Sequence, residues 1–176
     1  MPKLTALAAA HPTSHPTSEY KQLKSNIMNE TDRIFKASEV KLTYKNKVKA
    51  SDRYHIKGPN DAATIFLEIW DADTMDHIEE VKILLLNRAH HILGIATISK
   101  GGVTGSIIDT KVVLQYALKA NATAIIMAHN HPSGNLKPSE ADRRITDRLR
   151  TALEAIDVNL LDHIIINSDK EFEPIE

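Results

Sequence analysis

Two histidines and an aspartate stand at a spacing that suits a metal ion. A single residue separates His129 from His131. Seven residues follow, and then comes the string S-x-x-D, which ends at Asp142. The apolar run 124–128 just before them predicts a buried strand. Side chains alternate along a strand, so both imidazoles point to one face. Two neutral imidazoles and a carboxylate leave a fourth position free, which is the usual layout of catalytic zinc. The pattern predicts metal-assisted hydrolysis.

The S-x-x-D string also has a structural interpretation. Ser139 follows Pro138 and precedes Asp142 by three residues, as in the capping box that begins a helix. Pro132 and Gly134 predict a turn that brings this helix start back toward the histidines. The two roles are compatible, because a cap would fix where Asp142 points. The open alternative is a plain cap beside histidines that are only partly buried polar residues.

Three strings of this sequence together resemble the RadC family, which lies within the wider JAMM (MPN) group. They are H-N-H-P-S-G at 129–134, K-P-S-x-x-D at 137–142 and L-D-H-I-I-I at 161–166. The zinc peptidases of the group share E-x(n)-H-x-H-x(7)-S-x-x-D, and the part from the first histidine onward matches without a gap. The resemblance runs from about Lys47 to Phe172.

This resemblance implies a cofactor, a bond type and roles for four residues. It implies Zn²⁺ on His129, His131 and Asp142, with Ser139 donating a hydrogen bond near the reacting centre. The scissile bond would be an amide or isopeptide bond in a peptide or protein substrate, whose identity the sequence does not give. The reaction would be that of a zinc metallopeptidase of the JAMM type.

The resemblance to JAMM peptidases implies a glutamate general base at the start of the first core strand, where this chain has two glutamates. Glu79 and Glu80 directly precede the apolar run 81–86. Adjacent strand residues point to opposite faces, so one carboxylate can face the metal and the other solvent. The offset in similar RadC sequences favours Glu79. The alternative interpretation is a solvated acidic pair at a strand entrance.

Composition fits one small intracellular domain. The chain has 176 residues, of which 42% are hydrophobic, and its formal net charge is −1. That balance argues against a surface that binds nucleic acid as a whole. The absence of cysteine excludes thiolate ligands and disulfides. No apolar run approaches the roughly 20 residues that span a bilayer. We therefore expect no membrane association and a cytoplasmic location.

The first part of the chain differs from the rest. His-Pro-Thr-Ser at 11–14 repeats at 15–18, which predicts a solvated tail. Alternating apolar and lysine residues over 40–48 predict an exposed edge strand. We therefore divide the chain into a tail and edge segment, 1–46, and a RadC-like JAMM domain, 47–176.

Elsewhere hydrophobic periodicity predicts an α+β domain. Helices are expected over 61–70, with Trp70 as a core anchor, and over 110–120 and 140–156. Strands are expected over 81–86, 91–99, 124–128 and 158–166, the first two as a hairpin. His163 in the last strand is interpreted as structural rather than as a fourth ligand. The expected fold has three layers, a central mixed sheet between helices, as in JAMM and cytidine-deaminase-like proteins.

Two other function classes remain open on the sequence. The first is a non-catalytic metal-binding module associated with DNA repair, the label that RadC proteins carry. Lysines between Lys36 and Lys49 would make its phosphate contacts, although nothing before Lys47 resembles the helix-hairpin-helix region of longer relatives. The second, a magnesium-dependent nuclease, is prompted only by the letters H-N-H. In nucleases of that name these residues are scattered over a ββα unit.

Overall fold

The structure, a computed structural model, describes residues 18–19, 21–23, 41, 43–101 and 108–175. Internal contacts divide the chain into two units, Met1–Lys41 and Leu42–Glu176. Residues 11–17 of the predicted tail lie outside the described ranges. The second unit carries every described element on which the candidate site depends.

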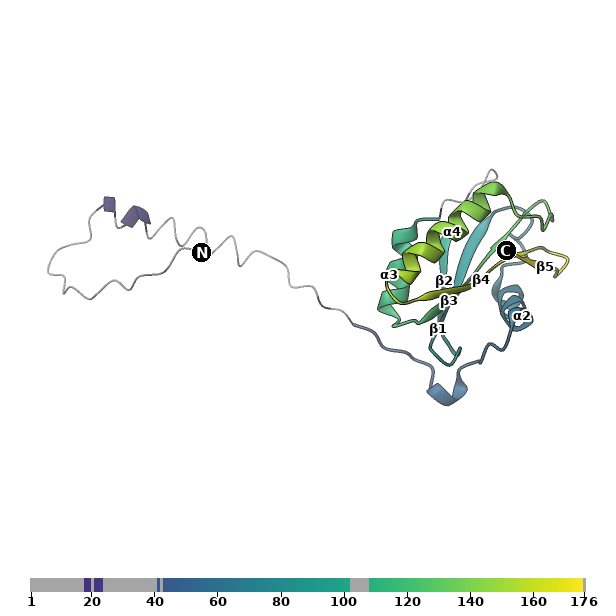
Figure 1. Ribbon diagram of the computed structural model, residues 1–176, viewed down its shortest axis with the longest axis horizontal. Helices are drawn as coiled ribbons and strands as arrows, with labels where there is room; N and C mark the ends of the chain where they lie inside the picture. The colour runs from purple at the N-terminus through teal and green to yellow at the C-terminus, as the bar shows by residue number, and fades with distance from the viewer. Residues whose placement is uncertain (1–17, 20, 24–40, 42, 102–107, 176) are drawn as a thin grey trace. The chain divides into compact units, whose positions relative to one another are not determined.

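The second unit is built on one mixed five-stranded sheet (Figure 1). The strands are β1 (Glu80–Leu86), β2 (Ile92–Lys100), β3 (Ala124–Asn130), β4 (Asn159–Ile166) and β5 (Phe172–Pro174), and the helices are η1 (Ala50–Asp52), α2 (Pro59–Ile69), α3 (Thr110–Lys119) and α4 (Glu140–Glu154). Their order in the sheet is β2-β1-β3-β4-β5. Only β3 and β4 are parallel, and α4 connects them. The predicted α+β fold is confirmed.

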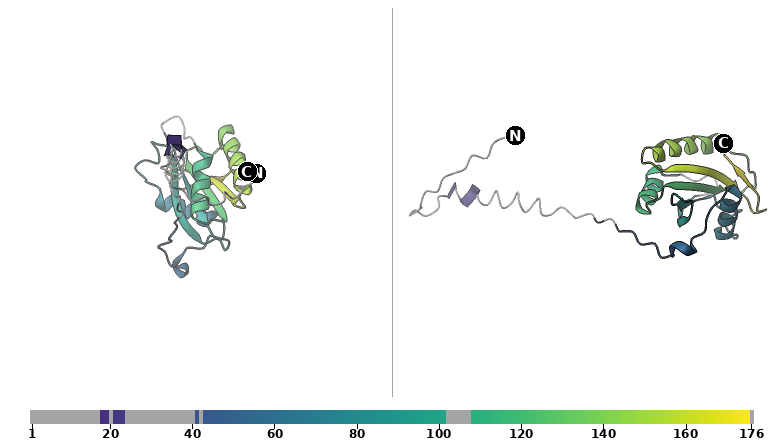
Figure 2. Two further views of the ribbon diagram at one scale, coloured as in Figure 1. Left: turned by 90° about the vertical axis from the view of Figure 1, so that its left-hand side faces the viewer. Right: turned by 60° about the horizontal axis from the view of Figure 1, so that its bottom comes forward.

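Helices cover both faces of the sheet, with α3 and α4 on one side and α2 on the other (Figures 1 and 2). Strand alternation divides the core accordingly. Ile83 of β1 packs in the cluster under α3 and α4, whereas its neighbour Leu84 packs in the cluster under α2. Both β1 and β3 are buried along their whole length. This burial on both faces explains why the sequences of β1 and β3 are largely continuous apolar runs rather than alternating patterns.

The structure bears out most of the predicted elements to within two residues. The hairpin of β1 and β2 is antiparallel as expected. Trp70 is a core residue, 5% exposed, although it stands just after α2 rather than within it. Asn121 adopts φ 51°, the left-handed conformation that ends many helices, just after Ala120, the C-cap of α3. Among the described residues, no helix has the length and apolar character needed to cross a membrane.

The predicted edge strand over 40–48 is wrong where the structure describes it. Lys41 and residues 43–48 lie outside any strand, while positions 40 and 42 are not described. The alternation there buries no apolar face, because Tyr44 and Val48 remain 41% and 49% exposed. The segment meets β2 through the Asn46 side chain, which donates to the Leu93 carbonyl (2.9 Å). Periodicity alone did not reveal that residues 43–48 pair with no strand of the sheet.

Four element ends meet at one edge of the sheet. The antiparallel register pairs Val81, near the start of β1, with His129, near the end of β3. The parallel register pairs His129 with Ile165, near the end of β4. Helix α4 begins a few residues after β3. The predicted ligands and both candidate glutamates therefore come from elements that converge here.

Candidate metal centre

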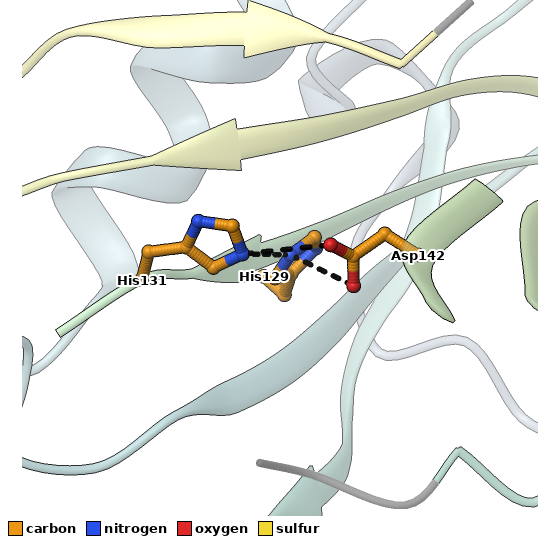
Figure 3. Close-up of side chains that lie close together, drawn as sticks. All are labelled: His129, His131 and Asp142. Atoms are coloured by element: carbon orange, nitrogen blue, oxygen red, sulfur yellow. Dashed lines mark hydrogen bonds and ion pairs between the residues drawn. The ribbon is translucent and has the colours of Figure 1, made fainter. Parts of the chain in front are cut away.

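The end of β3 presents two imidazoles on the side of the sheet that α4 covers. His129 is the next residue on the face of Ile125 and Met127, and His131 continues the same alternation just beyond the strand. Their Nε2 atoms lie 2.9 Å apart (Figure 3). His129 is 2% exposed because β3 is central in the sheet, whereas 17% of the His131 side chain is exposed.

Asp142 joins the histidines from the first turn of α4, where it closes a capping box. The Ser139 N–H donates to Asp142 Oδ2 (2.7 Å), and the Asp142 N–H donates to Ser139 Oγ (3.2 Å). These bonds direct the carboxylate toward the imidazoles, 3.5 Å from His129 Nε2 and 3.7 Å from His131 Nε2 (Figure 3). Asp142 therefore belongs both to the capping box of α4 and to the cluster with the two histidines.

The turn after His131 also fixes that imidazole. Gly134, at φ 74°, donates its N–H to the His131 carbonyl (2.9 Å) and turns the chain back. The Asn135 carbonyl then lies 2.5 Å from His131 Nδ1, so this ring nitrogen carries the proton and donates it. The lone pair of His131 is left on Nε2, which faces His129 and Asp142.

A chain of three hydrogen bonds determines the tautomer of His129. The Thr146 hydroxyl donates to the Asp142 carbonyl (2.6 Å), so it must accept from His163 Nδ1 (2.6 Å). Burial lowers the pKa of His163 well below its usual value, so this ring is neutral and its Nε2 carries a lone pair. His129 Nδ1 donates to that lone pair (2.8 Å). The lone pair of His129 is therefore also on Nε2.

This arrangement fits a tetrahedral metal ion. Two lone pairs facing each other across 2.9 Å repel unless a proton or a cation lies between them. Ligands about 2.0–2.1 Å from a tetrahedral ion are separated by about 3.3–3.5 Å. The two Nε2 atoms lie 2.9 Å apart, His129 Nε2 lies 3.5 Å from Asp142 Oδ1, and His131 Nε2 lies 3.7 Å from Asp142 Oδ2, all of which are close to that range. The donor set of two imidazoles and one carboxylate suits zinc.

The charge states also suit a metal at neutral pH. Burial lowers the pKa of His129 to about 4, so that this imidazole is neutral. Burial raises the pKa of Asp142, but His131 and the Ser139 hydrogen bonds outweigh it and hold that pKa well below its usual range. The Asp142 carboxylate raises the pKa of His131, and the charge of Glu79 adds to that effect. His131 is thus the candidate ligand for which protons would compete most strongly.

Metal affinity should therefore fall with decreasing pH in two separate stages. Below the raised pKa of His131, we expect a loss of about tenfold per pH unit, because protonated Nε2 cannot bind a metal. A second proton competes only near the pKa of His129, about 4. Calorimetric zinc titrations from pH about 8 to about 5 measure the first stage. A slope of two protons throughout that interval, or no slope, would contradict the assigned charge states.

The predicted structural role of His163 needs refinement, because its ring contacts His129, a candidate ligand. Replacing His163 with Leu should lower zinc affinity about 10–100-fold, since His129 Nδ1 loses the acceptor that orients its ring. His163→Gln is the matched control, because its side-chain oxygen can accept the same proton. We expect Gln to restore most of the affinity. Equal and undiminished zinc binding by both folded variants would contradict the orienting role.

Strand alternation separates the two candidate glutamates. Glu80 points to the α2 side, where its carboxylate pairs with Lys82 and with Lys100 (2.8 Å). Burial raises the pKa of Glu80, but the two lysines outweigh it and leave the pKa lowered. Glu79 lies one residue before β1, and alternation continued past the strand assigns it to the face of Val81, which pairs with His129. The carboxylate expected on the histidine side is therefore that of Glu79, in line with its charge, which contributes to the raised pKa of His131.

The Ser139 side chain is directed to Asp142. Its hydroxyl donates to Asp142 Oδ2 (2.6 Å), in addition to accepting the Asp142 N–H. The hydroxyl hydrogen is thus engaged with the candidate ligand. The hydrogen bond near the reacting centre that the family resemblance predicts requires this hydrogen to turn away from Asp142. In the described geometry Ser139 orients the carboxylate.

The sequence reasoning missed Thr146 and the contact of His163 with His129. The available signal was a histidine within an apolar strand pattern, which the structure buries to 1% exposure. Its partner could not be read from the sequence, because the contact depends on the parallel register that sets Met127 beside His163. Without that register, the sequence indicates only that Thr146 lies in a helix.

All the candidate site residues lie within the part of the sequence that matches one protein family. Residues 56–173 match the family model of the RadC-like JAB domain. A UPF0758 protein of Flavobacterium johnsoniae is 40% identical over 121 residues, which are 69% of this chain and 52% of the relative. A UPF0758 protein of Alkaliphilus oremlandii is 37% identical over 158 residues, which are 88% and 65%.

A UPF0758 protein of Clostridium kluyveri gives a similar result, at 34% identity over 136 residues, or 77% of this chain and 58% of the relative. The chain thus spans about half to two thirds of the length of these relatives. The three residues of the cluster, Glu79 and His163 all lie inside the matched range.

Proposed function

Since the chain belongs to the family of RadC-like JAB domains, we propose that it is a zinc-dependent hydrolase that cleaves an amide or isopeptide bond. The observation that carries the proposal is the cluster of His129, His131 and Asp142, whose donor atoms all lie within 4.8 Å of one another. Glu79 on the same side of the sheet supplies the candidate base. A bare helix cap would need neither the paired imidazoles nor their two matched tautomers.

In this proposal each residue of the site has one task. His129, His131 and Asp142 hold the ion and leave one position open. Zinc bound there would polarise the substrate carbonyl and lower the pKa of water toward about 7. Glu79 accepts a proton from the attacking water as its oxygen bonds to the carbonyl carbon, and it passes that proton to the leaving nitrogen as the C–N bond breaks.

The proposed substrate is a peptide or protein. Both this class of substrate and the amide or isopeptide bond rest on the resemblance to JAMM peptidases. A linear amide and a lysine-linked isopeptide present the same carbonyl and leaving nitrogen to zinc and Glu79. The two differ in what flanks the bond.

A library of fluorogenic linear peptides and lysine-linked isopeptides tests the proposal. The protein should cleave some members after zinc loading, lose that activity on chelation, and regain it when zinc is returned. Cleavage in ¹⁸O-water should place one labelled oxygen in the new carboxylate. A folded, zinc-loaded protein that cleaves no member of either set would contradict the proposed activity.

A further inference from the structure

Asn130 is a fully buried polar residue that the proposed reaction does not use. It stands between His129 and His131 in the chain but points to the opposite, α2 side of the sheet, and it is 0% exposed. Burying an amide side chain is costly unless its hydrogen bonds are made. The partners of this amide therefore indicate its role.

The Asn130 side chain makes three hydrogen bonds, all to the backbone of the segment that leads into β1. Its Nδ2 donates to the carbonyls of Met75 (2.6 Å) and Ile78 (2.9 Å), and its Oδ1 accepts the N–H of Glu80 (2.7 Å). Only one orientation of the amide is compatible with two carbonyls and one N–H. Both amide hydrogens are thus used within one short segment.

These contacts flank Glu79 on both sides. The Ile78 carbonyl belongs to the peptide group before the Glu79 Cα, and the Glu80 N–H belongs to the peptide group after it. The Glu79 carbonyl also accepts the N–H of Gly101 (2.9 Å). The backbone at Glu79 is therefore fixed at three points, two of which come from Asn130.

We propose that Asn130 is a positioning residue, which fixes the Met75–Glu80 segment so that the Glu79 carboxylate stays on the side of His129 and His131. One residue of β3 thereby links the backbone of the candidate base to the strand end that carries two candidate ligands. The inference rests on the proposed function, because it assigns a purpose to the position of Glu79.

Two Asn130 variants test the proposal. Asn130→Asp keeps the shape but replaces the two donors with an oxygen that repels both carbonyls, and Asn130→Ser removes the amide without adding charge. In each, amide hydrogen exchange over 75–80 should become at least about tenfold faster. Zinc should remain near one per chain, and kcat on a peptide or isopeptide substrate should fall about 100-fold, as for a misplaced catalytic group.

Asn87→Asp is the matched control. Asn87 Oδ1 accepts the N–H groups of Ala89 and His91 at the opposite end of β1, and the substitution keeps that acceptor. It should leave exchange over 75–80, zinc content and turnover unchanged. Glu79→Gln should lose turnover without a change in amide exchange over 75–80. This result would distinguish loss of the base itself from loss of its positioning.

The results decide the two proposals separately. Unchanged exchange over 75–80 in both folded Asn130 variants, or loss of zinc in proportion to loss of turnover, would overturn the positioning role. Full turnover by Glu79→Gln would overturn the assignment of the base instead. Faster exchange confined to 75–80 with zinc retained is the result that supports the role of Asn130.

Discussion

Glu79→Gln should lose about 10³-fold in turnover and keep its zinc. The substitution preserves the size of the side chain but removes the group that accepts the proton, and a positioned general base contributes about 10²–10⁴-fold. None of the three candidate ligands is altered, so zinc stoichiometry should stay at one. Single-turnover hydrolysis and metal analysis of the same preparation measure both quantities.

Glu80→Gln is the matched control for that prediction, because it makes the same chemical change one residue away. Glu80 pairs with Lys82, whose ammonium also lies 4.6 Å from the centre of the Trp70 ring. Removing the carboxylate charge leaves Lys82 buried without its counter-ion, which we expect to cost on the order of 3 kcal/mol of unfolding free energy. The folded fraction should retain turnover. A stable, inactive Glu80 variant beside an active Glu79 variant would reverse the assignment.

Asp142→Asn should lower zinc affinity by about 10³-fold while helix α4 stays capped. The side-chain oxygen of Asn can still accept the Ser139 N–H, but it lacks the charge of the carboxylate ligand. Losing one of three protein ligands forfeits a large share of the roughly 10–16 kcal/mol that structural zinc sites provide. Calorimetric titration with zinc measures the affinity.

Asp142→Ala separates the cap from the ligand. It should lose zinc to at least the same extent and also about 1 kcal/mol of stability in the presence of chelator, because the capping box is gone. Denaturant unfolding of both variants with chelator measures that difference. Zinc affinity equal to wild type in both variants would mean that Asp142 is only a cap.

The local parts of the site could be predicted from the sequence. The H-x-H pair follows an apolar run, and strand alternation is enough to bring the two imidazoles to one face. The S-x-x-D string predicts a helix start, and the capping box forms as expected. Both inferences need only a few neighbouring residues, so no tertiary contact was required to make them.

The remaining parts depend on contacts that are distant in the chain. Which glutamate shares the histidine face follows from the register of β1 against β3. The link from His163 to His129 spans 34 residues and follows from the pairing of β3 with β4. The wrong edge strand over 40–48 has the same origin, because alternation indicates an exposed face but does not show whether a partner strand is present.

The most direct test of the proposed centre is an anomalous difference map from zinc-soaked crystals, with data collected on both sides of the zinc absorption edge. We predict one strong peak per chain, about 2.0–2.2 Å from Nε2 of His129, Nε2 of His131 and a carboxylate oxygen of Asp142. The peak should appear above the edge and vanish below it. No peak among these three side chains, with zinc bound elsewhere or not at all, would contradict the metal centre and the hydrolase mechanism built on it.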